Sequence, residues 1–338
     1  MSDQTAPPVL RTVALTKAFG GLVAVRSVDF EVQAGSITSL IGPNGAGKTT
    51  LFNIVAGLYE PTSGQVEFLG ERVIASPERG WLEPILWVLP AFLTWGLTYL
   101  AGAAGAGTNE IQIMILIGLG LLITTLITAV VRPAWYTRLL VRLGVFKSAR
   151  PNDMVIAGIG RTFQNIRLFA NMTALENVLV GMHGKLKASP LDAVLRTKKQ
   201  VREELVSADE ARRLLKYVGL PGRESELARN LPYGDQRRLE IARALATKPK
   251  LLLLDEPTAG MNPSETASMM ALFGRVRTEL GLPILLIEHD MRVVMGISDR
   301  VTVLDHGEKI AEGTPRQIAT DEKAIKAYLG EEYGVATS

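Results

Sequence analysis

The sequence of 338 residues has no cysteine and only three histidines, at positions 183, 289 and 306. The lack of cysteine excludes a disulfide framework, and three scattered histidines give no cluster for a structural zinc site. This composition is compatible with a reducing, cytoplasmic setting. Residues 1–11 also lack an apolar run behind a positively charged start, so we expect no secretory signal.

A strong net charge is missing as well. The 37 basic and 34 acidic residues leave a formal charge of +3, which is too even to indicate nucleic-acid binding. Hydrophobic residues make up 47% of the chain, which is ample for a buried core. We therefore expect a globular protein with no nucleic-acid partner.

One long segment has almost no charged residues. Between positions 84 and 131 the only charged side chain is Glu110. The uncharged stretch Ile111–Val131 would be about 31 Å long as a helix, which matches the hydrocarbon thickness of a bilayer. Ile85–Leu100 is uncharged too, and its Pro90 is tolerated in membrane helices. The pattern predicts a two-helix transmembrane hairpin, which would anchor the chain through residues 81–131.

The charges around this segment support a hairpin with both ends in the cytoplasm. Residues 101–110 between the two stretches contain no basic side chain, whereas basic residues flank the pair at Arg72, Arg79, Arg132, Arg138, Arg142, Lys147 and Arg150. Residues 135–146 then show apolar positions at helical spacing, typical of an interfacial amphipathic helix. The alternative is a buried hairpin or a subunit contact in a soluble protein. Exposing such helices to water would cost about 25 cal/mol per Å² of apolar surface.

Outside residues 80–150 the pattern is that of a globular α/β protein. A charged, helix-rich stretch covers about 173–220. Strand candidates with β-branched or leucine-rich runs are Val9–Leu15, Val28–Val32, Ser36–Ile41, Gln65–Leu69, Lys250–Leu254, Pro283–Glu288 and Arg300–Leu304. Strands alternating with helices predict a parallel sheet.

A phosphate-binding loop follows one of these strands. The segment after residue 41 matches the Walker A pattern in full, between a strand and the start of a helix; its residues are Gly42, Pro43, Asn44, Gly45, Ala46, Gly47, Lys48, Thr49 and Thr50. Glycines let backbone amides turn around phosphates, and the helix N-terminus adds a favourable dipole. We expect Lys48 to neutralise the β- and γ-phosphates and Thr49 to bind Mg²⁺. The alternative is a glycine-rich turn with an incidental lysine.

A second motif lies two hundred residues later. Four leucines, 251–254, run into the adjacent acids Asp255 and Glu256, which is the Walker B arrangement of a buried strand ending in two carboxylates. Asp255 is expected on the magnesium side of the nucleotide. Glu256 is expected to accept a proton from the attacking water during in-line phosphoryl transfer. The alternative is a strand end capped by solvated acids.

The segment 231–245 resembles the signature of ATP-binding cassette (ABC) proteins, which completes the ATP site of the opposing subunit. Its signature residues would be Tyr233, Gly234, Asp235 and Gln236. Pro232 stands where the family has a serine, and Tyr233 where it has the first glycine, so a hydroxyl group for the γ-phosphate is missing. We hypothesise that backbone amides at the helix start still bind this phosphate.

Further residues match ABC positions in the right order. The resemblance implies that Gln164 reaches Mg²⁺ and the attacking water, and that His289 contacts the γ-phosphate and Glu256. It also implies that Phe19 stacks on adenine. Asn262 stands where many ABC proteins have the aspartate of the D-loop. Any one of these residues alone would be weak support, but they occur in register with the stronger motifs.

Taken together, these motifs resemble one subfamily, the ATP-binding subunits of branched-chain amino-acid importers of the LivG type. The resemblance covers residues 1–79 and 151–338, while the insertion 80–150 falls outside it. It implies a RecA-like P-loop ABC nucleotide-binding domain with an antiparallel β subdomain and a helical subdomain over about Ile166–Leu231. We expect three parts: a first cassette part at 1–79, the inserted hairpin and amphipathic helix at 80–150, and a second cassette part at 151–338.

The resemblance also implies the cofactors, partners and location. ATP and Mg²⁺ would bind at a head-to-tail interface with a paralogous ATPase subunit, in a hetero- or homodimer. Two transmembrane permeases and an extracytoplasmic solute-binding protein would complete an importer on the cytoplasmic face of the inner membrane. Urea, amides or other amino acids remain open as substrates. A soluble non-transport ABC ATPase and a regulatory subunit that binds ATP without hydrolysis remain open as functions.

Overall fold

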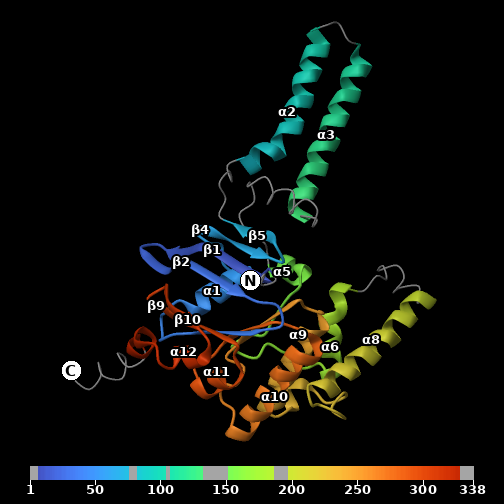
Figure 1. The fold of residues 1–338 in the computed structure, drawn as a ribbon. Coiled ribbons are helices and arrows are strands. Elements are labelled where there is room, and N and C mark those ends of the chain that lie inside the picture. Colours follow the sequence, from blue (N-terminus) through green and yellow to red (C-terminus); the bar gives the residue numbers. More distant parts are fainter. Residues whose placement is uncertain (1–6, 76–81, 104–106, 132–150, 186–196, 328–338) are drawn as a thin grey trace, which may run out of the picture.

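The computed structural model describes residues 7–75, 82–103, 107–131, 151–185 and 197–327. Two sheets form the body of the protein (Figure 1). The strands are β1 (Leu10–Phe19), β2 (Leu22–Val32), β3 (Ile37–Ile41), β4 (Ser63–Phe68), β5 (Glu71–Ala75), β6 (Ile159–Arg161), β7 (Leu251–Asp255), β8 (Ile284–Ile287), β9 (Arg300–Asp305) and β10 (Glu308–Gly313).

The helices cover these sheets or extend from them. They are α1 (Lys48–Val55), α2 (Leu82–Ala103), α3 (Thr108–Val131), α5 (Pro151–Ala157), α6 (Ala174–Met182), α8 (Lys198–Tyr217), α9 (Tyr233–Ala246), α10 (Pro263–Leu280), α11 (Met291–Ile297) and α12 (Pro315–Ile318). Short 3-10 helices lie at His183–Lys185 and Ala228–Asn230.

The smaller sheet is antiparallel, with strand order β2-β1-β4-β5. Its inner face contributes buried side chains such as Phe30 and Phe68 to one apolar cluster with Leu51 and Phe52 of α1. This contact packs the antiparallel sheet onto the first helix after the glycine-rich loop. The predicted antiparallel β subdomain is confirmed.

The larger sheet has the order β10-β9-β3-β8-β7-β6. β6, β7, β8, β3 and β9 run parallel, and β10 pairs antiparallel to β9. Strands β3, β7 and β8 are buried along their whole length, as expected of central strands covered on both faces. The predicted parallel sheet is confirmed. The short strand β6 and the edge strands β5 and β10 were not predicted, because they have few residues and no clear apolar alternation.

The helix-rich stretch predicted after residue 173 consists of α6 and α8, with residues 186–196 outside the described residues. A capping box starts α6, in which Thr173 and Glu176 exchange hydrogen bonds with each other's backbone. Apolar side chains of α6, α8 and α9, among them Val178, Leu215 and Leu239, share one buried cluster with the larger sheet. These helices therefore belong to the same packed body.

The insertion forms two helices, α2 and α3, that pack against each other and stand away from the sheets (Figure 1). Gly118 allows this packing, because a Cβ there would lie 2.8 Å from Thr94 Oγ1. Among the described residues, one stretch is long and apolar enough to cross a bilayer: Ile111–Thr128 of α3, with a mean hydropathy of 2.3. The helical hairpin is thus confirmed, whereas membrane crossing stays a prediction for both helices. The predicted amphipathic helix at 135–146 lies outside the described residues.

Candidate functional site

The predicted site residues follow four neighbouring parallel strands. In the order β3-β8-β7-β6, the strands lead into the loop 42–50, His289, Asp255 with Glu256, and Gln164. The carboxyl ends of parallel strands meet at one edge of a sheet, which is where α/β proteins bind ligands. The topology therefore brings together segments that are far apart in the sequence.

The glycine-rich loop has a backbone that requires glycine. Gly42, Gly45 and Gly47 have φ values of 151°, 79° and 94°. A Cβ at Gly47 would also collide with the carbonyl oxygen of Ala24. Helix α1 begins directly after this turn, so the amides of its first turn have no carbonyl partner within the helix. Such a helix start is an anion-binding site.

Lys48 lies across this loop. Its Nζ donates hydrogen bonds to the carbonyl oxygens of Gly42 and Pro43, at 2.6 and 2.8 Å. The ammonium group is therefore held where the loop turns, and a phosphate bound there would meet both the charge and the helix N-terminus. Its contact with the phosphates stays a prediction.

Asp255 ends the buried strand β7 and is only 2% exposed. Burial raises the pKa of its carboxyl group, and the neighbouring Glu256 acts in the same direction, whereas Arg161 opposes both. Glu256 has a φ of 46°, a conformation that a non-glycine residue adopts at a cost. Its amide donates to the carbonyl of Ile287 at 2.9 Å, which ties the ends of β7 and β8 together.

Two predicted residues meet at the Glu256 carboxylate. Gln164 Nε2 donates to Glu256 Oε2 at 3.2 Å, and His289 Nδ1 lies 3.9 Å from Glu256 Oε1. His289 is open to solvent, with 64% of its side chain exposed. The side chains come from segments after β6, β7 and β8. A water beside Glu256 would therefore have an acceptor and two polar neighbours.

A second acid supports this arrangement. Glu288 is buried, and its Oε1 accepts hydrogen bonds from the amide and the hydroxyl of Thr258, at 3.1 and 2.5 Å. Its Oε2 accepts a hydrogen bond from the amide of His289 at 3.2 Å. Glu288 thus fixes both the segment after Glu256 and the backbone of His289. Our sequence reasoning missed it, although an acid at the end of an apolar strand was a usable signal.

An ion pair on α9 holds the segment that carries Gln164. Arg237 donates to the carbonyl oxygens of Phe163, at 2.7 Å, and Gln164. Glu240 accepts the amide of Phe163 at 3.2 Å and lies 3.4 Å from Arg237. Both charged side chains are buried, and burial raises the pKa of Glu240. The sequence signal would have been two opposite charges three residues apart on an otherwise apolar helix face.

The predicted signature residues open α9. Side-chain groups of Tyr233, Asp235 and Gln236 contact their own chain: the Tyr233 hydroxyl accepts from Arg237, and Gln236 donates to the carbonyl of Leu231 at 2.8 Å. In Figure 1, α9 lies among α6, α8 and α10, apart from α1. Within one chain, the structure does not bring the signature residues to the glycine-rich loop.

Phe19 ends β1 and is exposed. The exposed Tyr59 ring packs against it in a T-shaped arrangement, with ring centroids 5.4 Å apart. The Lys17 ammonium lies 4.8 Å from the Phe19 centroid. An exposed aromatic ring is available for stacking on a base. Sequence reasoning identified Phe19 but not its neighbour Tyr59.

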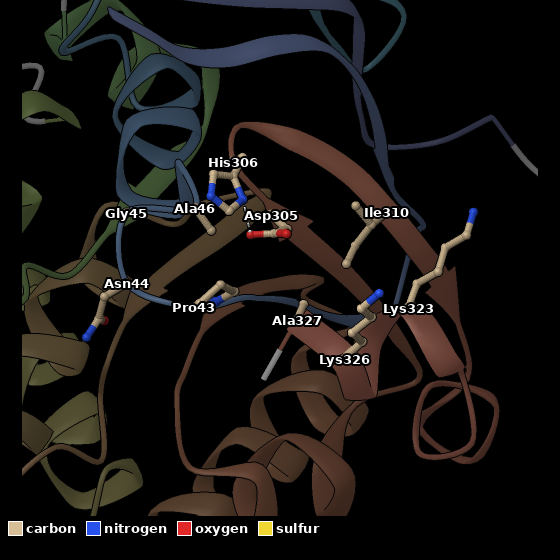
Figure 2. A pocket seen from close by; sticks show the side chains of 10 residues that line it. All are labelled: Pro43, Asn44, Gly45, Ala46, Asp305, His306, Ile310, Lys323, Lys326 and Ala327. Carbon is tan, nitrogen blue, oxygen red and sulfur yellow. Dashed lines mark ion pairs between the residues drawn. The ribbon is translucent and has the colours of Figure 1, made fainter. Parts of the chain in front are cut away.

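A cavity of about 700 Å³ lies beside the loop, on the side of the β9–β10 turn (Figure 2). Its walls are Pro43, Asn44, Gly45, Ala46, Asp305, His306, Ile310, Lys323, Lys326 and Ala327. Figure 2 shows the His306 and Asp305 side chains paired above the loop. His306 Nδ1 and Asp305 Oδ1 are 2.7 Å apart.

The residues of this edge suit magnesium bound with a nucleotide. Thr49, Gln164 and Asp255 offer oxygen atoms, which Mg²⁺ prefers, and Mg²⁺ usually needs only one or two carboxylates beside phosphate oxygens. The described residues contain no group of three or more His, Asp or Glu side chains that could hold a metal by themselves. The donor set therefore fits a metal that arrives with a triphosphate.

Comparisons with known proteins agree with this arrangement. The family model described as "ABC transporter" matches residues 25–89 and 145–259, and the model "Branched-chain amino acid ATP-binding cassette transporter" matches 308–334. Residues 90–144, between the two matched stretches, include most of the α2–α3 hairpin.

Curated relatives match along nearly the whole chain. The high-affinity branched-chain amino acid transport ATP-binding protein BraF of Pseudomonas aeruginosa is 36% identical, covering 96% of this chain and 98% of its own length. LivG of Escherichia coli K12, with the same description, is 37% identical at the same coverage. A crystal structure of the ADP conformation of an ATP-binding cassette of an ABC transporter matches with a TM-score of 0.64 and 24% sequence identity. The match covers 96% of this chain and 100% of that chain. At this identity the likeness shows the fold alone.

Proposed function

This chain belongs to the ABC transporter family of ATP-binding subunits, and on that premise we propose that it hydrolyses ATP to power an importer of branched-chain amino acids. The substrate class is supported by the names of its relatives and by the family model that matches residues 308–334. Growth or uptake assays with labelled leucine, with urea and amides as competitors, would test the substrate class.

The observation that carries the ATPase proposal is the meeting of Gln164 and His289 at the Glu256 carboxylate. Glu256 accepts a proton from water as the water attacks the γ-phosphate. Gln164 and His289 hold the water and the carboxylate in line, so the gain comes mainly from positioning. Glu288 and the Arg237–Glu240 pair keep these three side chains in place.

The loop and its neighbours hold the substrate. The amides of residues 42–50 and the Lys48 ammonium bind the phosphates, and Phe19 stacks on the adenine. Thr49, Asp255 and Gln164 supply the oxygen ligands for Mg²⁺. When bound, the metal neutralises charge that develops on the phosphate oxygens.

A second cassette completes the site. In a head-to-tail dimer, the start of α9 would face the phosphates bound by the other subunit. The Tyr233 and Gln236 side chains are engaged within their own chain, so we assign the contact to backbone amides, as at other helix N-termini. The other subunit would be a paralogue or a second copy, and two permeases and a solute-binding protein would complete the importer.

We also propose that the cassette, residues 1–79 and 151–338, works at the cytoplasmic face of the inner membrane with the α2–α3 hairpin in the bilayer. No part of the Ile111–Thr128 window is buried. The hydroxyl groups of Thr98, Thr124 and Thr128 donate to carbonyls three or four residues earlier. Hydroxyl groups that donate to the backbone of their own helix need no hydrogen bond from water, so they can lie in a bilayer.

The substitution Glu256→Gln tests the ATPase proposal. Glutamine keeps the shape of the side chain but cannot take the proton, so we expect ATP binding to persist while phosphate release by the assembled complex falls at least ~100-fold. Glu204→Gln, on the exposed surface of α8, is the matched control and should keep wild-type turnover. Wild-type phosphate release by Glu256→Gln would remove the assigned base.

A further inference from the structure

Arg161 is the last residue of β6, and its guanidinium group faces the buried acid of β7. Arg161 Nη2 lies 3.5 Å from Asp255 Oδ2, and only 12% of the arginine side chain is exposed. Its Nε donates to the carbonyl of Thr162 at 3.3 Å. Among the described residues its Nη1 has no hydrogen-bond partner, although it is buried. The guanidinium group therefore makes few hydrogen bonds. Its interaction with Asp255 is mainly the attraction between opposite charges.

Two aromatic rings fix this charge in place. The guanidinium carbon lies 4.8 Å from the centroid of Phe52 and 5.1 Å from that of Phe163. Phe52 is fully buried on α1, the helix that follows the glycine-rich loop, and Phe163 directly precedes Gln164. Arg161 thus contacts three segments that carry the predicted nucleotide ligands: α1, the end of β7, and the segment after β6.

We propose that Arg161 is a positioning residue that acts as the resident counter-cation of Asp255 and stands in for magnesium while no nucleotide is bound. This inference rests on the proposed function, because it assumes that Asp255 faces Mg²⁺. A buried carboxylate without an opposite charge is strongly unfavourable. Arg161 lies 3.5 Å from Asp255, offsets its charge and holds the carboxylate in place, and the metal of a bound Mg-ATP would then share this carboxylate.

If Arg161 acts in this way, its removal should change how much magnesium stabilises the protein. Without Arg161, Asp255 loses its ion pair at 3.5 Å, and a bound metal would offset a larger share of the charge on its carboxylate. The protein should then depend more on Mg-ATP for its stability than the wild type does. A role in packing alone predicts the opposite: the loss on removing Arg161 would be equal with and without metal.

The experiment is thermal unfolding of the full-length chain in detergent, with ATP plus EDTA and with ATP plus Mg²⁺. For Arg161→Met we expect the unfolding temperature in EDTA to fall by at least about 5 °C. The rise on adding Mg²⁺ should be larger than in the wild type by a similar amount. An equal rise in both proteins would overturn the inference.

Two further variants separate charge from packing. Arg167 lies 4.7 Å from the same Phe163 ring and is exposed, so Arg167→Met should keep the wild-type magnesium effect. Arg161→Lys keeps the charge but loses the flat stacking group, and it should also keep the wild-type effect. An enlarged magnesium effect in Arg161→Lys would contradict a role through charge, and this variant decides the matter if Arg161→Met does not fold.

The failure of this inference can be told apart from that of the proposed function. If wild-type protein gains no stability from Mg²⁺ with ATP, the nucleotide site itself is wrongly assigned. If the wild type gains stability and Arg161→Met gains the same amount, only the role of Arg161 is wrong. Unfolding of Arg161→Met in an Asp255→Asn background adds a test without metal, since the effect of the arginine should shrink once its carboxylate partner is gone.

Discussion

The carboxyl edge of the larger sheet and the α2–α3 hairpin differ in which side chains they bury and which they expose. At the sheet edge, charged residues such as Asp255, Arg237 and Glu240 are buried, and each has a charged partner. In the hairpin, large apolar side chains such as Trp95 and Leu116 are exposed. A buried charge is tolerated only with fixed partners, and an exposed apolar face only beside another apolar phase. The comparison teaches that the buried charges of the sheet edge find their partners within one chain, whereas the exposed apolar side chains of the hairpin fit the bilayer contact proposed above.

The largest effect should come from the sheet edge. His289→Ala removes the imidazole that faces Glu256, and we expect turnover of the assembled complex to fall about 10²–10³-fold, or about 3–4 kcal/mol in activation free energy. ATPase kinetics measure this. His306→Ala is the matched control, since His306 is exposed and also faces a carboxylate, that of Asp305. Equal losses in both variants would mean that the edge does not form a specific site.

The hairpin should respond to a charge on its exposed face. Leu119 is 53% exposed on α3 and lies within the apolar stretch. Leu119→Arg should cost about 2.5–3.5 kcal/mol in a bilayer, and less than about 0.5 kcal/mol in water. Carbonate extraction of membranes from cells expressing the chain alone measures the change: wild type stays in the pellet, and the variant is partly released.

A control substitution sharpens the same comparison. Leu205 on α8 is 64% exposed, yet α8 belongs to the cassette. Leu205→Arg should leave membrane retention and stability at wild-type values. Full release of the wild-type chain by carbonate would contradict the membrane assignment of the hairpin.

The smallest effect concerns an ion-paired acid of the larger sheet. Burial tends to raise the pKa of Glu312, but hydrogen bonds from Lys309, at 2.8 Å, and Arg300, at 2.7 Å, outweigh it and hold the pKa below its usual value. Because the folded pKa is depressed, this stabilisation is present above a pH of about 4.5 and is lost as the pH falls through the folded value.

Glu312→Gln should therefore lower the free energy of unfolding by about 1 kcal/mol at pH 7 and by less at pH 4. Urea unfolding at the two pH values measures the difference. Glu308 pairs with Arg26 at 3.3 Å on the exposed surface, so Glu308→Gln should change little at either pH. A loss for Glu312→Gln that does not depend on pH would show that its ion pairs do not stabilise the fold.

Much of this architecture could be predicted because the chemistry is local. The loop 42–50 needs glycines at its left-handed positions. A run of leucines ending in Asp255 and Glu256 predicts a buried strand with acids at its end. The long uncharged stretches likewise predicted α2 and α3. Strand β6 could not be predicted, because three residues carry no periodic pattern and its place depends on pairing with β7.

The sequence by itself determined the family, the nucleotide-binding loop, the acids and the presence of an apolar hairpin, since each depends on residue types over a short span. The tertiary structure alone decided which charged residues support the site. The contacts of Arg161 with Asp255, of Glu288 with Thr258, and of Arg237 with the carbonyl of Gln164 join residues 30 to 94 positions apart. No local pattern encodes such pairs, because strand order, which packing selects, brings them together.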